Sequence, residues 1–224
     1  MGRMAPRGPA PARIFLLSPA QCGGKRAGFL FNPGARFDLA MRLRDPRGVP
    51  LGEVFSFVSG LYFRGKSAYA SAFARPPHGM GGSLVITTNR GLLPADTTVT
   101  LDDLRDMACV DIASDERRYR TPLERDARAL AALPRPAEFV LLGSVATGKY
   151  VDVLLKELRE RLCFPSEFVG RGDMSRGGLM LRCVDEGREL ESVPVDGAVR
   201  RGQRPPKLER RVRSSSTSTP ANGA

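Results

Sequence analysis

EFVLLGSVATGKY, residues 138–150, is the stretch that decides the fold of this chain. Its apolar run 139–142 has the length of a buried strand, and a glycine-bounded turn ending in Lys149 follows it. Four apolar residues then recur at the i, i+3, i+4, i+7 spacing of one buried helix face: Val151, Leu154, Leu155 and Leu158. A strand, a tight turn and an amphipathic helix in this order favour a βαβ unit and a parallel sheet.

The turn itself predicts an anion site. From Gly143 to Lys149 it fits the first seven positions of the phosphate-binding loop G-x-x-x-x-G-K, but Tyr150 stands where that loop has the Ser or Thr that holds Mg²⁺. Backbone N–H groups at a helix N-terminus bind anions without a metal. We therefore expect phosphate to be held by residues of this turn: Gly143, Ser144, Thr147, Gly148 and Lys149. The plainer interpretation is that Ser144 and Thr147 cap the helix and that Lys149 is solvated.

A second candidate site is the segment FVGRGDMSRGG, residues 168–178, which combines four glycines with charged side chains. Arg171 and Arg176 could grip a phosphate or carboxylate through paired hydrogen bonds, and Asp173 could act as an acid or base. We expect a loop here, because glycines allow backbone conformations that other residues avoid. The alternative is a surface loop whose Arg–Asp pair contributes little.

The remaining pattern predicts further strands and helices. Strand-like runs occur at 14–17, 84–88 and 179–184, with a weaker one near 189–193, whereas the state of the apolar run 54–58 is open. Helical composition covers 66–74, and Thr100 and Thr121 are expected to be N-caps, the second with Pro122 at the first helical position. The expected fold is a single α/β domain over residues 13–198, with a mainly parallel central sheet flanked by helices.

The positive charge lies mostly outside this domain. Of the net charge of +11, residues 1–13 carry +3 and residues 199–224 carry +6, which leaves +2 for residues 14–198. We expect residues 1–12 to be a flexible N-terminus and 199–224 a basic, Ser/Thr-rich disordered tail. Such a tail could attract nucleic acid or another polyanion, or it could simply aid solubility.

Composition excludes several other classes of site. The four cysteines are far apart and His78 is the only histidine, so a Cys/His zinc site is unsupported and no metal ligand or cofactor is identified. Cys22 lies near Lys25, a cation that could lower the pKa of its thiol. No apolar run approaches the ~20 residues that cross a bilayer, and none has the length of a secretory signal, so we expect a cytoplasmic protein without a membrane partner.

Three segments resemble a known bacterial family. Ser18–Arg26, the run GLYFRGKSAYA at 60–70 and the run VITTNRGLLPAD at 85–96 follow the landmark order of bacterial domains of unknown function distantly related to the peroxide-stress DNA-binding protein family. The resemblance covers residues 14–100, and the chain departs from it at Ser18-Pro19, where Ser-Cys is more usual. It implies a cytoplasmic α/β protein connected with DNA or nucleobases.

Together these patterns predict the kind of ligand. Ligands of open α/β sheets bind beyond the carboxyl ends of the strands, where we expect the loops 18–25, 89–91 and 144–149 to lie. If they converge with Arg171 and Arg176, the site is strongly cationic. The expected function is binding of a phosphate-bearing ligand, a nucleotide or nucleic-acid component. The alternatives are a non-enzymatic DNA- or RNA-binding protein that uses its basic tail, and a Mg-dependent P-loop-like NTPase. Whether the protein is an enzyme stays open.

Overall fold

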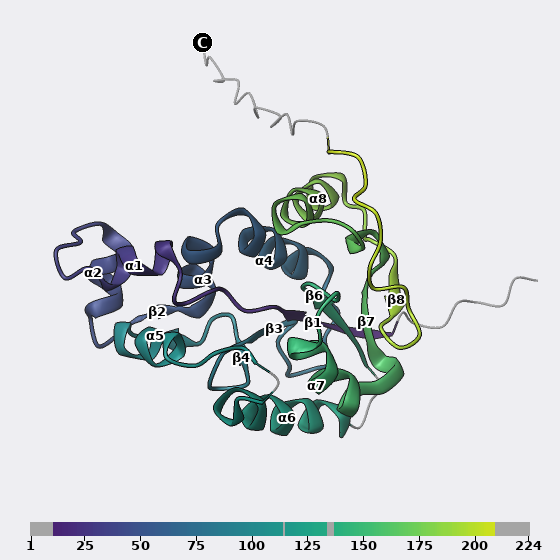
Figure 1. The fold of residues 1–224 in the computed structure, drawn as a ribbon, viewed down its shortest axis with the longest axis horizontal. Coiled ribbons are helices and arrows are strands. Elements are labelled where there is room, and N and C mark those ends of the chain that lie inside the picture. The colour runs from purple at the N-terminus through teal and green to yellow at the C-terminus, as the bar shows by residue number, and fades with distance from the viewer. Residues whose placement is uncertain (1–10, 114, 134–136, 209–224) are drawn as a thin grey trace, which may run out of the picture.

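A six-stranded sheet lies at the centre of the computed structural model, which describes residues 11–113, 115–133 and 137–208 (Figure 1). The strand order is β4-β3-β1-β6-β7-β8, and only the edge strands β4 and β8 run antiparallel to their neighbours. The strands are β1 (Ala12–Leu17), β3 (Ser83–Ile86), β4 (Leu92–Pro94), β6 (Ala137–Leu142), β7 (Leu162–Pro165) and β8 (Ser192–Pro194). The predicted α/β domain with a mainly parallel sheet is thus confirmed.

The central pair β1 and β6 is apolar because both of its faces are covered. Phe15 is in register with Val140, and these side chains belong to the apolar cluster on one face of the sheet. Ile14 and Leu16 of the same strand point into the cluster on the other face. A parallel strand buried on both sides has to be apolar at consecutive positions, which is why these runs were recognisable in the sequence.

Helices cover the two faces in separate layers. Helices α4 and α8 lie on one face, with α3 beside them, and α6 and α7 lie on the other (Figure 1). Their bounds are α3 (Leu51–Ser59), α4 (Leu61–Phe73), α6 (Arg117–Ala131), α7 (Gly148–Leu158) and α8 (Asp173–Glu186), with the short 3-10 helices η1 (Arg159–Arg161) and η2 (Ser166–Phe168) on either side of β7. The predicted strand-turn-helix of residues 138–158 is therefore present as β6 and α7.

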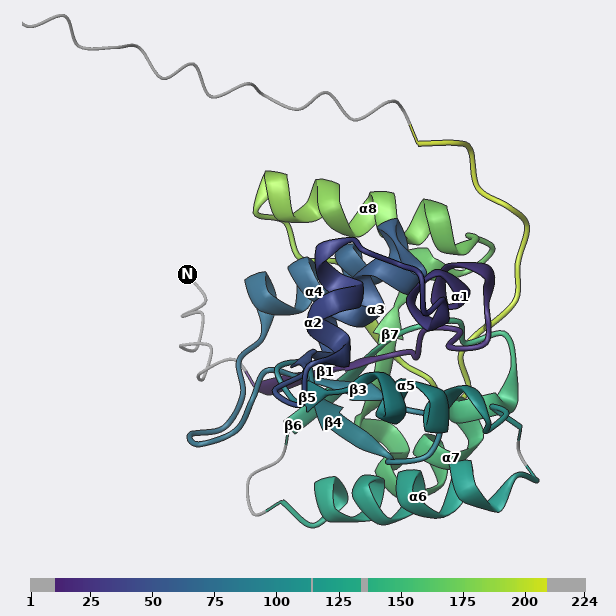
Figure 2. The same ribbon diagram turned by 90° about the vertical axis from the view of Figure 1, so that its left-hand side faces the viewer.

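A small cap lies beyond the carboxyl ends of the parallel strands, at the left of Figure 1 and in front in Figure 2. It contains α1 (Lys25–Phe31), α2 (Asp38–Arg44), α5 (Leu101–Ala108) and the two-stranded antiparallel sheet of β2 (Val49–Pro50) and β5 (Thr98–Val99). The predicted N-cap Thr100 is confirmed: its side chain accepts the N–H of Asp103, whose carboxylate accepts the N–H of Thr100 at 2.7 Å.

Three of the expected assignments are wrong. The helix expected to begin at Thr121 begins at Arg117, and Pro122 lies inside it. The reason is burial: Tyr119 and Leu123 lie on the apolar face of α6, so starting the helix earlier buries Tyr119, at the cost of the one backbone hydrogen bond that Pro122 cannot donate. The run 179–184, expected to be a strand, is part of α8, and Asp173–Gly178, expected to be loop, is its first half.

Glycines explain why α8 was missed. A Cβ on Gly177 would lie 2.9 Å from the Leu61 carbonyl oxygen, and a Cβ on Gly65 would lie 2.7 Å from the Gly177 carbonyl oxygen. The glycines let α4 and α8 pack backbone to backbone, although glycine disfavours a helix by about 1 kcal/mol relative to alanine. This close crossing brings residues 62–66 of α4 next to residues 173–176 of α8.

The chain continues along the domain after residue 198. Arg201 donates two hydrogen bonds to the Ala146 carbonyl, and Leu208 packs against the apolar cluster under α8. The rest of the expected tail, 209–224, and residues 1–10 of the expected flexible N-terminus lie outside the described residues. No helix among the described residues has the length and apolar character needed to cross a membrane.

Candidate functional site

A cavity of about 1110 Å³ opens where the carboxyl ends of the parallel strands meet the cap; we call it the crevice. After β1 the chain enters the cap and returns through α4 on one face, whereas β6 is followed by α7 on the other face, so the crevice lies at the topological switch point of the sheet. Its walls include residues 18–23 after β1, Thr88 after β3, residues 110–113 after α5, and Ser144, Thr147 and Lys149 after β6.

The predicted phosphate turn contributes three of its five named residues to the crevice wall. Ser144, Thr147 and Lys149 line it, whereas Gly143 lies behind them and Gly148 lies against the carboxylate of Asp152. Thr147 is the N-cap of α7, but its side chain makes no capping hydrogen bond. Its hydroxyl therefore accepts no hydrogen bond from the first N–H groups of the helix. That geometry leaves donors for an anion.

Tyr150 stands where the phosphate-binding loop has a Ser or Thr, and its side chain folds back under the turn of residues 143–149. Its Oη accepts a hydrogen bond from the Ser144 N–H at 2.8 Å. Gly143 is small for this reason, because a Cβ there would lie 2.8 Å from Ser18 Cβ and 2.9 Å from Tyr150 Oη. One N–H of the turn is therefore committed to a side chain of the protein.

The second predicted segment forms a neighbouring cavity of about 530 Å³. Arg171, Asp173 and Arg176 line it together with Arg204, and it shares Ser144 and Asp173 with the crevice. Arg176 is buried and donates to the Phe168 carbonyl at 3.3 Å, while its guanidinium lies 3.4 Å from the Asp173 carboxylate. The two predicted segments therefore do meet.

The crevice is not the strongly cationic site that was expected. Its wall carries one cation, Lys149, and two carboxylates, those of Asp111 and Asp173. Arg171 and Arg176 line the adjacent cavity instead. Mixed charge of this kind offers an anion site at one place and hydrogen-bond acceptors at another.

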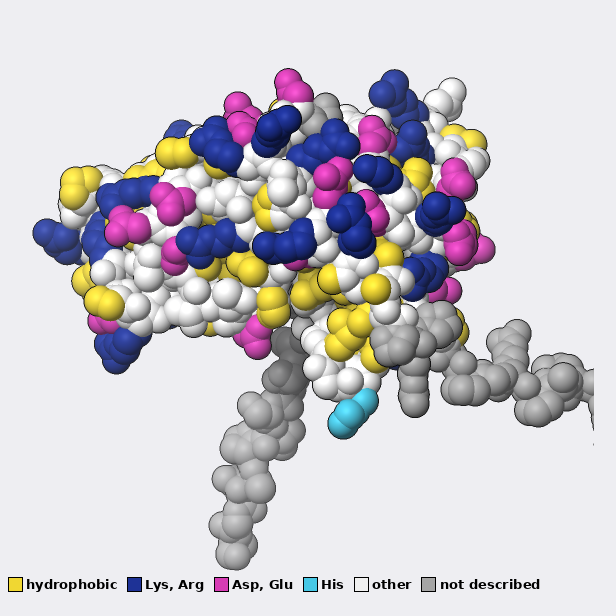
Figure 3. All heavy atoms as spheres, turned by 90° about the horizontal axis from the view of Figure 1, so that it is seen from below, with side chains coloured by type: hydrophobic (Ala, Val, Ile, Leu, Met, Phe, Trp, Pro, Cys, Tyr) yellow, Lys and Arg dark blue, Asp and Glu magenta, His cyan; other side chains and the backbone are white. Residues whose placement is uncertain are grey.

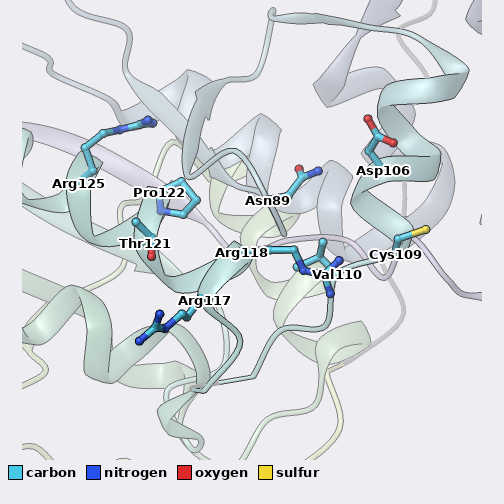
Figure 4. Close-up of a pocket in the computed structure, with 9 residues that line it drawn as sticks. All are labelled: Asn89, Asp106, Cys109, Val110, Arg117, Arg118, Thr121, Pro122 and Arg125. Carbon is cyan, nitrogen blue, oxygen red and sulfur yellow. The ribbon is translucent and has the colours of Figure 1, made fainter.

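The predicted loop 89–91 does not line the crevice. Asn89 turns into a separate cavity of about 540 Å³ between α5 and α6, shown in Figure 4, whereas Thr88, expected at the end of the preceding strand, lines the crevice. The Oδ1 of Asn89 is buried and has no hydrogen-bond partner among the described residues. Arg118 and Arg125 of the same cavity already pair with Glu116 and Asp126. Two of the three arginines that line this cavity are therefore already in ion pairs.

Lys66 is the residue that the sequence reasoning missed. Its side chain is fully buried, and its Nζ donates to the Ser18 carbonyl at 2.5 Å and to Ser18 Oγ at 3.0 Å. The ammonium lies over the rings of Tyr62 and Phe63, 4.5 and 4.7 Å from their centroids. The signal was present, because Lys66 lies between apolar residues at i−4, i−3, i+3 and i+4 and so belongs to the buried face of its helix.

Burial controls the electrostatics around Lys66. Desolvation lowers the pKa of Lys66 to about 7, and the Asp173 carboxylate opposes this shift only in part. Desolvation also raises the pKa of Tyr62, whose buried hydroxyl has no hydrogen-bond partner among the described residues and lies in the crevice wall. A lysine whose pKa is lowered to about 7 therefore lies buried behind the crevice wall, and a phenol whose pKa is raised lies in the wall itself.

Cys22 contradicts the expectation of a thiol with a lowered pKa. It is buried, and desolvation raises the pKa of its thiol to about 12. The thiol points back to the Ala20 carbonyl at 3.6 Å rather than toward Lys25. Burial outweighs a cation that is close only in sequence.

We expect Lys66 to make the stability of the protein rise with pH above about 7. Between that value and the ordinary pKa of 10.5 the unfolded chain holds a proton on Lys66 that the folded chain has released, so raising the pH favours the folded state. Lys66→Met removes the group and should remove this part of the rise. Urea denaturation of both proteins at pH 7, 8 and 9 measures it. A difference in unfolding free energy that stays constant over this range would contradict the assignment.

Within the described part of the chain, no three Cys, His, Asp or Glu side chains come together as a metal-binding group. Comparison of the sequence with protein-family models and with curated proteins, and of the structure with solved structures, found no match.

Proposed function

We propose that the crevice binds a phosphate-bearing ligand, a nucleotide or a nucleic-acid component. The observation that carries this proposal is that the loops after β1, β3 and β6 line one cavity of about 1110 Å³ at the switch point of the sheet. Ligand cavities are commonly 300–1,000 Å³, so the space suffices for a nucleotide.

The two kinds of charge in the wall favour a nucleotide over a simple polyanion. Lys149 and the uncapped start of α7 suit a phosphate. The carboxylates of Asp111 and Asp173 would repel further phosphate but accept hydrogen bonds from sugar hydroxyls or base amino groups. The unpartnered hydroxyl of Tyr62 adds a buried donor to the same wall.

We expect Lys149→Ala to weaken ligand binding by about tenfold or more, because a hydrogen bond to a charged group contributes about 1.5–3 kcal/mol. The measurement is thermal stability against a panel of nucleotides, nucleosides and sugar phosphates, with and without Mg²⁺, since a ligand at 100 times its Kd stabilises by about 2.7 kcal/mol. The matched control is Lys156→Ala. Lys156 lies on the same helix near Glu124 and does not line the crevice, so it should leave binding unchanged. Equal binding by the Lys149 variant, or no stabilising compound at all, would refute the proposal.

The neighbouring cavity supports a second candidate, nucleic-acid binding without catalysis. Arg171, Arg176 and Arg204 lie beside the crevice, and Arg204 comes from the basic C-terminal segment. A polyanion longer than one nucleotide could extend from the crevice along these arginines. On the face that carries α6, by contrast, Lys and Arg alternate with Asp and Glu (Figure 3), and Arg120 and Arg128 pair with Glu124 and Glu157. Replacing Arg171 and Arg204 together by alanine should weaken DNA or RNA binding at least tenfold in this second case and leave nucleotide binding intact, since neither side chain lines the crevice.

A further inference from the structure

Ser18 and Lys66 form a pair that phosphate binding does not use. Ser18 follows β1 directly, at the carboxyl end of a central strand; it is 5% exposed and lines the crevice, and Lys66 lies fully buried behind it on α4. The Lys66 amine is 3.0 Å from Ser18 Oγ, within the reach of a proton transfer. Serine is activated as a nucleophile when a base holds its hydroxyl in this way.

The surroundings of Lys66 suit a base rather than a fixed cation. Among the described residues no carboxylate lies within ion-pair distance of its Nζ. The groups that face it are the Tyr62 and Phe63 rings of its own helix and, at longer range, Asp173 of α8. Arg176 of α8 and Tyr150 of α7 lie in the next layer, around Tyr62. Burial without a counter-ion favours the neutral amine, in agreement with the lowered pKa of Lys66.

We propose that Ser18 and Lys66 are the nucleophile and general base of an acyl-transfer site in the crevice, with a carboxylic ester as the class of substrate. The neutral amine of Lys66 takes the proton of the Ser18 hydroxyl while Oγ attacks the ester carbonyl carbon. The bond from that carbon to the leaving oxygen breaks, and the leaving alkoxide takes the proton from the Lys66 ammonium. Water then attacks the carbonyl carbon of the acyl-serine while the Lys66 amine takes its proton. The bond from that carbon to Ser18 Oγ breaks, and Oγ takes the proton back from Lys66, which releases the carboxylic acid and restores Ser18.

Donors for the negative charge of the intermediate lie in the same loop. The backbone N–H groups of residues 20–23 donate to no group among the described residues, and all four residues line the crevice. Tyr150 Oη also lies close to Ser18, since both approach the position of a Cβ on Gly143, at 2.9 Å for Oη and 3.2 Å for Ser18 Oγ. Backbone and phenol donors around a nucleophile are what stabilises a tetrahedral oxyanion.

The test is covalent labelling of the full chain with an uncharged alkyl fluorophosphonate, in which serine Oγ attacks phosphorus and fluoride leaves. Intact-mass analysis and peptide mapping locate and time the adduct. We expect one adduct on Ser18, with a rate that rises with pH through about 7 and then levels off. Ser18→Ala should abolish it. Lys66→Met should slow it at least 100-fold, in keeping with the loss of a general base.

Ser71→Ala is the matched control, because Ser71 lies exposed on the same helix as Lys66 and does not line the crevice, and it should label at the wild-type rate. Cooperative urea unfolding checks that each variant is folded. The proposal is overturned if the folded wild-type protein forms no Ser18 adduct at pH 8, or if folded Lys66→Met labels as fast as wild type. The probe carries no charge, so labelling reports on this pair alone, and nucleotide-induced stabilisation reports on phosphate binding alone.

Discussion

Phe15→Ala is expected to lower the free energy of unfolding by about 3–5 kcal/mol, the usual cost of truncating a buried phenylalanine to alanine. Phe15 is 1% exposed in the centre of β1, and its ring meets the Tyr69 ring edge to face at 5.5 Å between centroids. The contact joins β1 to α4. Because native domains are stable by only about 5–15 kcal/mol, this single change removes a large share of the total.

Urea denaturation measures this loss, and Phe29→Ala is the matched control. Phe29 lies on α1 and is 50% exposed, so the same substitution there should change stability by less than about 0.5 kcal/mol. Similar losses in the two variants would mean that Phe15 is not in the core contact described. The same experiment bears on the site, because Phe15 and Tyr69 each lie three residues from a member of the Ser18–Lys66 pair.

Gly177→Ala should destabilise the protein by about 2 kcal/mol, although alanine is the better helix former by about 1 kcal/mol. Its methyl group would lie 2.9 Å from the Leu61 carbonyl oxygen and from Tyr62 Cα. Those are backbone atoms of a packed helix, so α8 has to move away from α4. The movement would also shift Asp173 and Arg176 away from Lys66 and Tyr62.

Gly178→Ala is the control for this prediction. Gly178 is the next residue of the same helix, and the nearest atom to its added Cβ is Leu208 Cδ1 at 3.8 Å, an ordinary contact. We expect this variant to gain up to about 1 kcal/mol from helix propensity. Thermal or urea unfolding of the pair separates steric exclusion from propensity. A destabilised Gly178 variant, or a Gly177 variant of wild-type stability, would contradict the packing described for α4 and α8.

Local signals in the sequence were sufficient for several elements. The strand β6, the turn and α7 could be predicted because their apolar spacing and glycine boundaries act over a few residues. The capping box of α5 was readable for the same reason, since Thr100 and Asp103 satisfy each other's backbone groups. The meeting of the loops after β1 and β6 followed from the rule that parallel strands end at one edge of the sheet. Their convergence with Arg171 and Arg176 was only a condition, because residues 168–178 were expected to be a loop that precedes a strand, whereas they include the start of α8.

Other features depend on contacts between distant residues. Helix α8 looks like a glycine-rich loop followed by a strand, and only its packing on α4 through Gly65 and Gly177 makes a helix the better solution. In the same way, Pro122 lies inside α6 because burial of Tyr119 outweighs one lost hydrogen bond.

The sequence by itself therefore determined the fold class and the place of the crevice, because hydrophobic period and strand ends are local properties. Only the tertiary structure decided the chemistry inside it. Lys66 and Ser18 are 48 residues apart, and the character of both follows from their meeting. Lys66 is buried beside the close crossing of α4 and α8, and desolvation lowers the pKa of its amine.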